Sequence, residues 1–215
     1  MIIFKRLIFS VLFIAFVSDL GANPFEGIIY FQKKEGNNIT FFKYFIKGDN
    51  VRIEDVNEEG SLNGILLIDM NKASLKMLSC NSQLYIDVPI SPECEKPEVR
   101  IERSGEFKMI KGKECELWKV LDTKDYSRFE FWVNNGDYPF FSPMLRMLNR
   151  KDNIALAWIS LLVGDNYFPF SGIEYSSTGK ELTRLEVIEI QEKNLDTSLF
   201  AIPSNYSLFE RKISK

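Results

Sequence analysis

Short runs of β-branched and aromatic residues, separated by compact turn sequences, account for most of this chain. The turn sequences contain glycine, asparagine, aspartate, serine or lysine and lie at residues 35–38, 48–50, 111–113 and 176–179. Connections this short join antiparallel strands, whereas a parallel crossover needs about a dozen residues or more. The pattern therefore predicts a mainly β protein, folded as an antiparallel meander. The predicted strands are residues 25–32, 39–47, 51–55, 64–69, 74–78, 84–88, 99–103, 106–110, 116–121, 128–133, 167–175 and 182–190.

Two of the turn glycines, Gly48 and Gly112, stand where a tight hairpin needs a backbone with positive φ. Apolar and polar residues do not alternate cleanly along the flanking strands. In residues 39–47 and 128–133, apolar side chains fall on both faces of the predicted strand. Because a sheet with one face in water alternates more regularly, part of the second face should be covered by another element.

A single helical region is the predicted cover. It begins at Ser142-Pro143, an N-cap followed by proline at the first helical position, and carries Met144 and Met147. Residues 151–153 interrupt it, and an apolar segment follows at residues 154–163. That segment is apolar all round, which predicts burial, and it is too short to span a bilayer, which takes about 20 residues.

The N-terminus has the order of an export signal. Lys5 and Arg6 precede an apolar run at residues 7–17, and small residues then lead to Ala22. The apolar run is about half the length that a membrane-spanning helix needs. We therefore predict that residues 1–22 are a signal peptide cleaved after Ala22; the alternative is an uncleaved anchor.

Cleavage would leave residues 23–215 as one β domain, periplasmic or secreted. Asn23 stands where a lipid-carrying cysteine would have to be, so the mature chain is expected to be soluble and not transmembrane. Losing the segment removes two positive charges and one negative charge, so the formal net charge of −3 becomes −4. Lys and Arg are scattered without forming a block, which argues against a nucleic-acid partner.

Histidine is absent from the chain. Its absence excludes Ser-His-Asp and Cys-His catalysis, His-ligated zinc and imidazole acid–base chemistry. Aspartates such as Asp49, Asp69 and Asp87 have the spacing of solvated turns. The sequence therefore predicts no catalytic residue, no metal site and no cofactor, and the protein is not expected to be an enzyme.

Three cysteines, Cys80, Cys94 and Cys115, allow at most one intramolecular disulfide. In a simple meander Cys80 and Cys115 would be about three strand spacings apart, or ~14 Å. A disulfide tolerates a Cα separation of only about 4.4 to 6.8 Å. Any disulfide is therefore expected to contribute little to the fold.

Residues 25–210 resemble a family of secreted bacterial proteins classed as domain of unknown function 4412, grouped with the LolA-like half-barrels of outer-membrane lipoprotein carriers. The segments that carry the resemblance are Phe25-Glu-Gly27, Tyr44-Phe-Ile-Lys-Gly48, Val51-Arg-Ile53, Ile110-Lys-Gly112 with Cys115 and Trp118, Phe131-Trp-Val133, and Leu199-Phe-Ala-Ile-Pro203 with Tyr206. The resemblance implies a curled antiparallel sheet packed on a short hydrophobic helix, in a protein of the bacterial envelope. It implies no activity, because the family has none assigned.

Two functions are consistent with these features. In the first, the sheet and the helical region enclose a cavity for a lipid, an acyl chain or a lipoprotein. The expected ligand-binding residues are then Phe42, Tyr44, Trp132, Met144, Met147, Ala155, Ala157 and Trp158. In the second, the same side chains fill a solid core, and edge strands or residues 134–142 bind another envelope protein.

Overall fold

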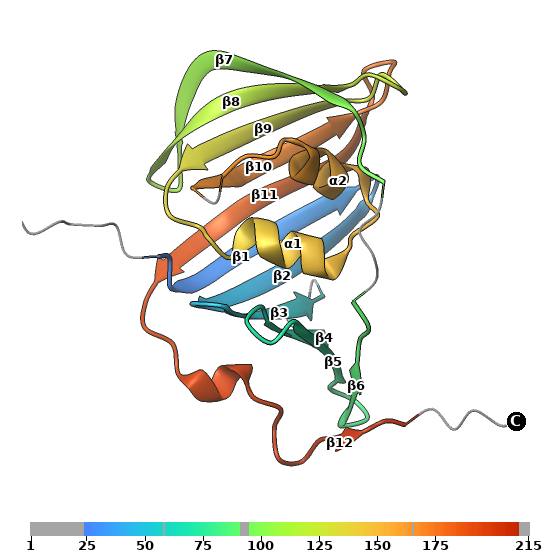
Figure 1. Cartoon of the computed structure of the whole chain (residues 1–215), viewed down its shortest axis with the longest axis vertical. Helices are drawn as coiled ribbons and strands as arrows, with labels where there is room; N and C mark the ends of the chain where they lie inside the picture. Colours follow the sequence, from blue (N-terminus) through green and yellow to red (C-terminus); the bar gives the residue numbers. More distant parts are fainter. Residues whose placement is uncertain (1–23, 58, 91–94, 165, 211–215) are drawn as a thin grey trace, which may run out of the picture.

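The computed structural model describes residues 24–57, 59–90, 95–164 and 166–210. The predicted signal peptide and Cys94 lie outside the described residues. Within them, one 12-stranded sheet curls around two short helices (Figure 1). The strands are β1 Gly27–Glu35, β2 Asn38–Lys47, β3 Asn50–Val56, β4 Leu62–Asp69, β5 Ser74–Ser79, β6 Leu84–Asp87, β7 Val99–Ile110, β8 Lys113–Asp122, β9 Arg128–Asn135, β10 Tyr167–Tyr175, β11 Glu181–Glu192 and β12 Ser207–Leu208.

The strand order is β12-β6-β5-β4-β3-β2-β1-β11-β10-β9-β8-β7. The sheet therefore consists of two meanders, β1 to β6 and β7 to β11, which are joined where β1 pairs with β11. The short β12 pairs in parallel with β6, and the other neighbouring strands are antiparallel. The prediction of one continuous meander was wrong, because local turn sequences say nothing about which distant strands pair.

The two predicted turn glycines are confirmed. Gly48 has φ +54° in the β2–β3 hairpin, and Gly112 has φ +78° in the β7–β8 hairpin. Most observed strands differ from the predicted ones by one to three residues at an end, and residues 99–103 and 106–110, predicted as two strands, form the single strand β7. Its register with β8 shifts between Arg103 and Phe107, around Gly105 with φ +70°. A bulge therefore interrupts the ladder at the place where two strands were expected.

The helical region forms two helices, α1 Phe141–Leu148 and α2 Asn153–Ser160. The predicted N-cap at Ser142 was wrong, since the N-cap of α1 is Phe140, two residues earlier, and it makes no side-chain capping hydrogen bond. For α2, Asp152 is the cap, and its carboxylate accepts a hydrogen bond from the Ala155 N–H at 3.3 Å. The predicted apolar helix at residues 154–163 is largely confirmed as buried, but it ends earlier, and Leu162 is 81% exposed.

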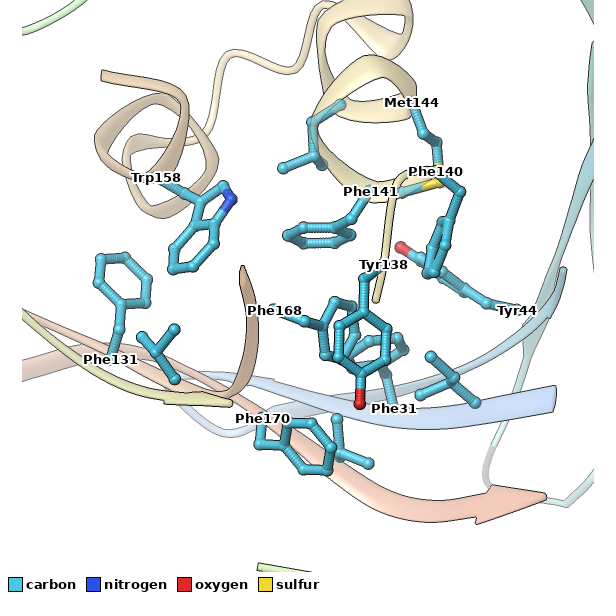
Figure 2. Packing of buried hydrophobic residues seen from close by; sticks show 14 of the residues in the cluster. Phe31, Tyr44, Phe131, Tyr138, Phe140, Phe141, Met144, Trp158, Phe168 and Phe170 are labelled. Carbon is cyan, nitrogen blue, oxygen red and sulfur yellow. The ribbon is translucent and has the colours of Figure 1, made fainter. Parts of the chain in front are cut away.

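Both helices lie against the concave face of the sheet, and the core fills the space between the layers (Figure 1, Figure 2). Aromatic side chains make up much of this core. Tyr138 and Phe140 precede α1, and Phe168 lies on β10 between Phe31 of β1 and Phe141 of α1, with ring centroids 5.9 and 4.7 Å away. A curled antiparallel sheet packed on short hydrophobic helices is the architecture that the sequence predicts.

The sheet order also changes the expected geometry of the cysteines. Cys80 follows β5 and Cys115 lies on β8, eight strand positions away in the sheet instead of three. Both are free thiols, and burial raises the pKa of Cys115 from 9.0 to about 11. No helix in the described part of the chain is both long and apolar enough to cross a bilayer.

Candidate functional site

A small apolar cavity lies between the concave face of the sheet and the two helices. Its volume is about 50 Å³. Five strands, both helices and the segment that joins the helices contribute to its wall. The lining residues are Phe31, Lys33, Phe42, Tyr44, Phe131, Phe141, Leu145, Arg150, Asp152, Ile154, Ala155, Trp158, Pro169, Gly172 and Leu185. Eleven of these fifteen residues are apolar and four are polar or charged, so the cavity suits a mostly hydrocarbon ligand.

Aromatic rings from the sheet and from α1 pack against one another around the cavity. The rings of Phe31 on β1 and Tyr44 on β2 lie 4.7 Å apart across the hairpin, at a tilt of 56°. Phe141 of α1 meets Phe168 edge to face at 4.7 Å, and these rings gather below the helices in Figure 2. Such edge and offset contacts each add to the stability gained from burial.

The absence of a side chain at Gly172 on β10 keeps part of the cavity open. A Cβ atom at this position would lie 3.0 Å from Cδ1 of Ile154 and 3.1 Å from the ring of Phe131. Both contacts are tighter than van der Waals packing allows without movement. Because position 172 has no side chain, Ile154 of α2 packs directly over the backbone of β10.

The indole of Trp158 is the most buried polar group of the cavity wall. The side chain is 2% exposed, lies parallel to Trp118 at 6.2 Å, and meets Phe131 and Phe141 edge to face at 5.4 and 5.9 Å. Its Nε1 atom is buried and has no hydrogen-bond partner. Trp118 differs, because its own Nε1 donates to Oε2 of Glu116 at 2.8 Å.

Charged groups lie at the segment that joins the two helices. Nε of Arg150 donates to Oδ2 of Asp152 at 2.7 Å, and the same carboxylate caps α2. Burial lowers the pKa of Arg150, but the negative charge of Asp152 and its hydrogen bond with Arg150 raise this pKa above its ordinary value overall. Burial has the opposite effect on Tyr44, because it raises the pKa of the phenol, which is therefore neutral at physiological pH. On β1, Lys33 pairs with Glu35 at 3.2 Å.

A larger depression, of about 910 Å³, opens at the end of the sheet near the start of β1. Its wall includes the charged residues Glu26, Lys113, Asp137 and Glu192, and Lys113 donates to Glu192 at 2.7 Å. The depression is wide and lined in part by charged side chains, whereas ligand sites are enclosed and mainly apolar. We therefore take the small cavity under the helices as the candidate site. No described group of three or more acidic or cysteine side chains could hold a metal ion.

Comparison with known families decides how the chain is classified. Residues 25–206 match the model of a domain of unknown function, DUF4412. The chain belongs to this family. The match includes every lining residue of the cavity and both helices.

One solved structure shows a similar fold at low sequence identity. This DUF4412 protein is similar to an uncharacterized conserved protein from Thermus thermophilus, with a TM-score of 0.51, 10% identity, and 86% of this chain and 91% of that chain covered. Weaker matches include MucB in its complex with MucA from Pseudomonas aeruginosa (TM-score 0.49, 9% identity, 83% of this chain and 56% of that one). A putative outer membrane lipoprotein-sorting protein domain from Vibrio parahaemolyticus also matches (TM-score 0.31, 8% identity, 81% and 87%). No curated protein sequence matches the chain.

Four of the eight residues that the sequence suggested for ligand binding line the cavity of this DUF4412 protein. They are Phe42, Tyr44, Ala155 and Trp158. The other four, Trp132, Met144, Met147 and Ala157, do not line the cavity.

Two of these four, Met144 and Ala157, are completely buried in the core. Met147 packs at the edge of the core and is partly buried. Trp132 lies between Phe131 and Val133 on β9, which both face the core, so its ring points to the other face of the sheet. There the ammonium of Lys108 lies 3.8 Å from the ring centroid.

Sequence reasoning missed the polar part of the wall. Residues 151–153 were interpreted only as a break between helices. Asp152 nevertheless precedes an apolar run, as an N-cap residue does, so its capping role could have been recognised from the sequence. Lys33 and Arg150 carry no local signal, since only the folded chain brings β1 and the interhelical segment together. Gly172 sits inside a strand, where a glycine can mark the close approach of another element.

Proposed function

We propose that this protein is an exported, non-catalytic binding protein of the bacterial envelope that holds an apolar ligand between its helices and the concave sheet. The observation that supports this most is the apolar cavity itself, in which Phe42, Tyr44, Ala155 and Trp158 meet. Each methylene group moved from water into such a site contributes about 0.8 kcal/mol. A lipid or the acyl chain of a lipoprotein could therefore bind without an extended polar recognition surface.

The size of the cavity constrains how a ligand would enter. Sites for small molecules usually measure about 300 to 1,000 Å³, far more than the 50 Å³ present here. We interpret the described conformation as a closed one, in which α1 and α2 must move away from the sheet to admit a chain. Both helices are only eight residues long, and residues with positive φ follow each of them, Asn149 at 44° and Leu162 at 49°. Asparagine often adopts this conformation at the end of a helix, whereas for leucine it is strained, and such strain often marks segments that rearrange.

The proposed location is the periplasm or the outside of the cell, after removal of residues 1–22. It rests on the order of charged, apolar and small residues at the N-terminus. N-terminal sequencing of the exported protein should begin at Asn23 or within a few residues of it. Recovery of intact Met1 from washed membranes would contradict the proposed processing.

Binding can be measured on the exported protein with diphenylhexatriene, a hydrocarbon that fluoresces only in apolar surroundings. We expect saturable binding with one site per chain, and native mass spectrometry should show a co-purifying lipid that organic extraction removes. A protein that shows neither saturable fluorescence nor bound lipid would refute the carrier proposal.

A second function is favoured by one feature of the sheet edge. Among the described strands, β7 ends the sheet and exposes Ile101, Phe107 and Met109, at 40, 61 and 65%. An edge strand with free backbone groups can add a strand from a partner protein. Residues 134–142, the other proposed partner surface, are unsuited because Tyr138 and Phe140 are buried.

The partner surface is tested separately from the cavity. Replacing Phe107 and Met109 by lysine should abolish cross-linking to an envelope protein without changing diphenylhexatriene binding. Unchanged cross-linking of that double variant would exclude β7 as the contact surface.

A further inference from the structure

The buried indole nitrogen of Trp158 is a hydrogen-bond donor that has no acceptor in the closed structure. It is the single described side-chain nitrogen or oxygen that is buried without a hydrogen-bond partner. Native structures rarely leave a buried donor unpaired, because the lost hydrogen bond to water is not replaced. An unpaired donor in a ligand cavity therefore indicates that a partner arrives with the ligand.

The position of the indole fits this interpretation. Ala155 and Trp158 lie three residues apart on α2, so they share the helix face that is turned to the cavity, and both line it. In Figure 2 the indole nitrogen lies on the side of the ring that faces Phe141 of α1, away from Phe131. Phe141 also lines the cavity, so the N–H edge of the indole lies within the cavity wall.

A resident water molecule is a poor partner for this donor. A buried water usually makes about three hydrogen bonds, and the ring neighbours of the indole are Trp118, Phe131 and Phe141. The charged groups of the wall are already engaged, because Arg150 pairs with Asp152. The acceptor must therefore be an oxygen that an otherwise apolar molecule carries.

We propose that Trp158 is the polar recognition residue of the cavity, and that its Nε1 donates to the carbonyl oxygen of an acyl ligand. The proposal rests on the proposed binding function and narrows its ligand class. Acyl esters, amides and fatty acids have a carbonyl group at the head of a hydrocarbon chain, whereas hydrocarbons such as diphenylhexatriene have none. The cavity should therefore prefer an acyl ligand to a hydrocarbon of the same shape.

A matched pair of probes tests this preference. Diphenylhexatriene and the methyl ester of its propionic acid derivative share a fluorophore, and only the second carries a neutral carbonyl group. We expect the parent protein to bind the ester about 3- to 10-fold more tightly, as one additional hydrogen bond predicts. Trp158→Phe also changes the shape of the cavity wall, so the readout is the ratio of the two affinities, and the variant should bind the ester and the hydrocarbon equally tightly.

Trp118→Phe is the matched control. It removes an indole that stacks on Trp158 but donates to Glu116, so the preference for the ester should persist. A direct readout needs no variant at position 158. The chain has three tryptophans, and in ¹⁵N-labelled protein the indole resonance of Trp158, assigned by substituting the other two, should shift downfield with the ester but not with the hydrocarbon.

The outcomes separate the two proposals. If neither probe binds to the parent, the carrier function fails and the inference with it. If both probes bind equally and the indole resonance of Trp158 responds alike to both, the carrier function stands and the role of Trp158 is refuted. A preference for the ester that survives Trp158→Phe would refute it as well.

Discussion

Ala155 and Ala157 lie two residues apart on α2 and face opposite surroundings. Ala155 lines the cavity, whereas Ala157 is completely buried in the core and does not reach the cavity. Two residues correspond to about 200° around an α-helix, so the two methyl groups point in nearly opposite directions. The pair therefore separates the effect of filling the cavity from the effect of overpacking the core.

The first prediction uses this pair. Ala155→Phe should occupy the cavity, so diphenylhexatriene binding should fall at least tenfold with a small change in melting temperature. Ala157→Phe should cost about 1 to 3 kcal/mol of folding free energy, because the new ring has no space. Probe titration and urea unfolding of both variants measure the two effects. Equal destabilisation by both substitutions would mean that the space beside Ala155 cannot accept a ligand.

The second prediction concerns the hairpin glycines. At Gly48 and Gly112 a Cβ atom would meet nothing within 4 Å, so any cost of substitution arises from the backbone alone. Because both have positive φ, Gly48→Val and Gly112→Val should each destabilise the protein by more than about 1 kcal/mol. Gly164→Val is the control, since its surroundings are equally open and its φ lies outside the positive range. Equal melting temperatures for all three variants would contradict the role of positive φ.

The third prediction concerns acid sensitivity at the start of β1. Oε1 of Glu26 accepts hydrogen bonds from Nζ of Lys47 at 2.7 Å and from the Leu195 N–H at 2.8 Å. These bonds, led by the one from Lys47, hold the pKa of Glu26 below its ordinary 4.5 although burial opposes them. A carboxyl group whose pKa is lower in the folded state stabilises the fold above its unfolded pKa, and this contribution disappears as the pH falls through the folded value.

Glu26→Gln should therefore reduce stability at pH 7 by about 0.5 to 1.5 kcal/mol, near the lower end because the side chain is one-third exposed. Urea unfolding at pH 7 and again below pH 4 should show the difference from the parent shrinking in acid. Glu35→Gln, which removes an exposed partner of Lys33, should have little effect at either pH. A Glu26→Gln effect that stays constant with pH would exclude the ionised carboxylate as its cause.

Most strands were predictable because the turn residues that end them act locally. The predicted strand 167–175 coincides with β10, and the glycines at positions 48 and 112 mark real hairpins. The pairing of β1 with β11 was not predictable, because it depends on contacts between distant residues that no local pattern encodes. The same limit explains why the cysteine separation was underestimated.

The candidate site was predictable in part for a related reason. Aromatic residues on both faces of β2 pointed to Phe42 and Tyr44, and a short alanine-containing helix pointed to Ala155. Met144 and Ala157 were misplaced because the rotation of each helix on the sheet decides which apolar side chain faces the cavity. That rotation depends on packing, such as the close approach of Ile154 to Gly172, and not on helix propensity.

The central ladder between β1 and β11 has a consequence for how the nascent chain folds. Gly27 of β1 pairs with Glu192 of β11. Among the described strands β1 is synthesised first, and the edge that pairs with β11 stays unpaired until nearly all of the other strands have been synthesised. Until then the apolar residues Ile29 and Phe31 sit on a free edge that another chain could extend. Such non-local pairing slows folding, and it obliges the two halves to assemble after synthesis is almost complete. A chain of this topology therefore closes its sheet at the β1–β11 ladder only after β11 has been synthesised.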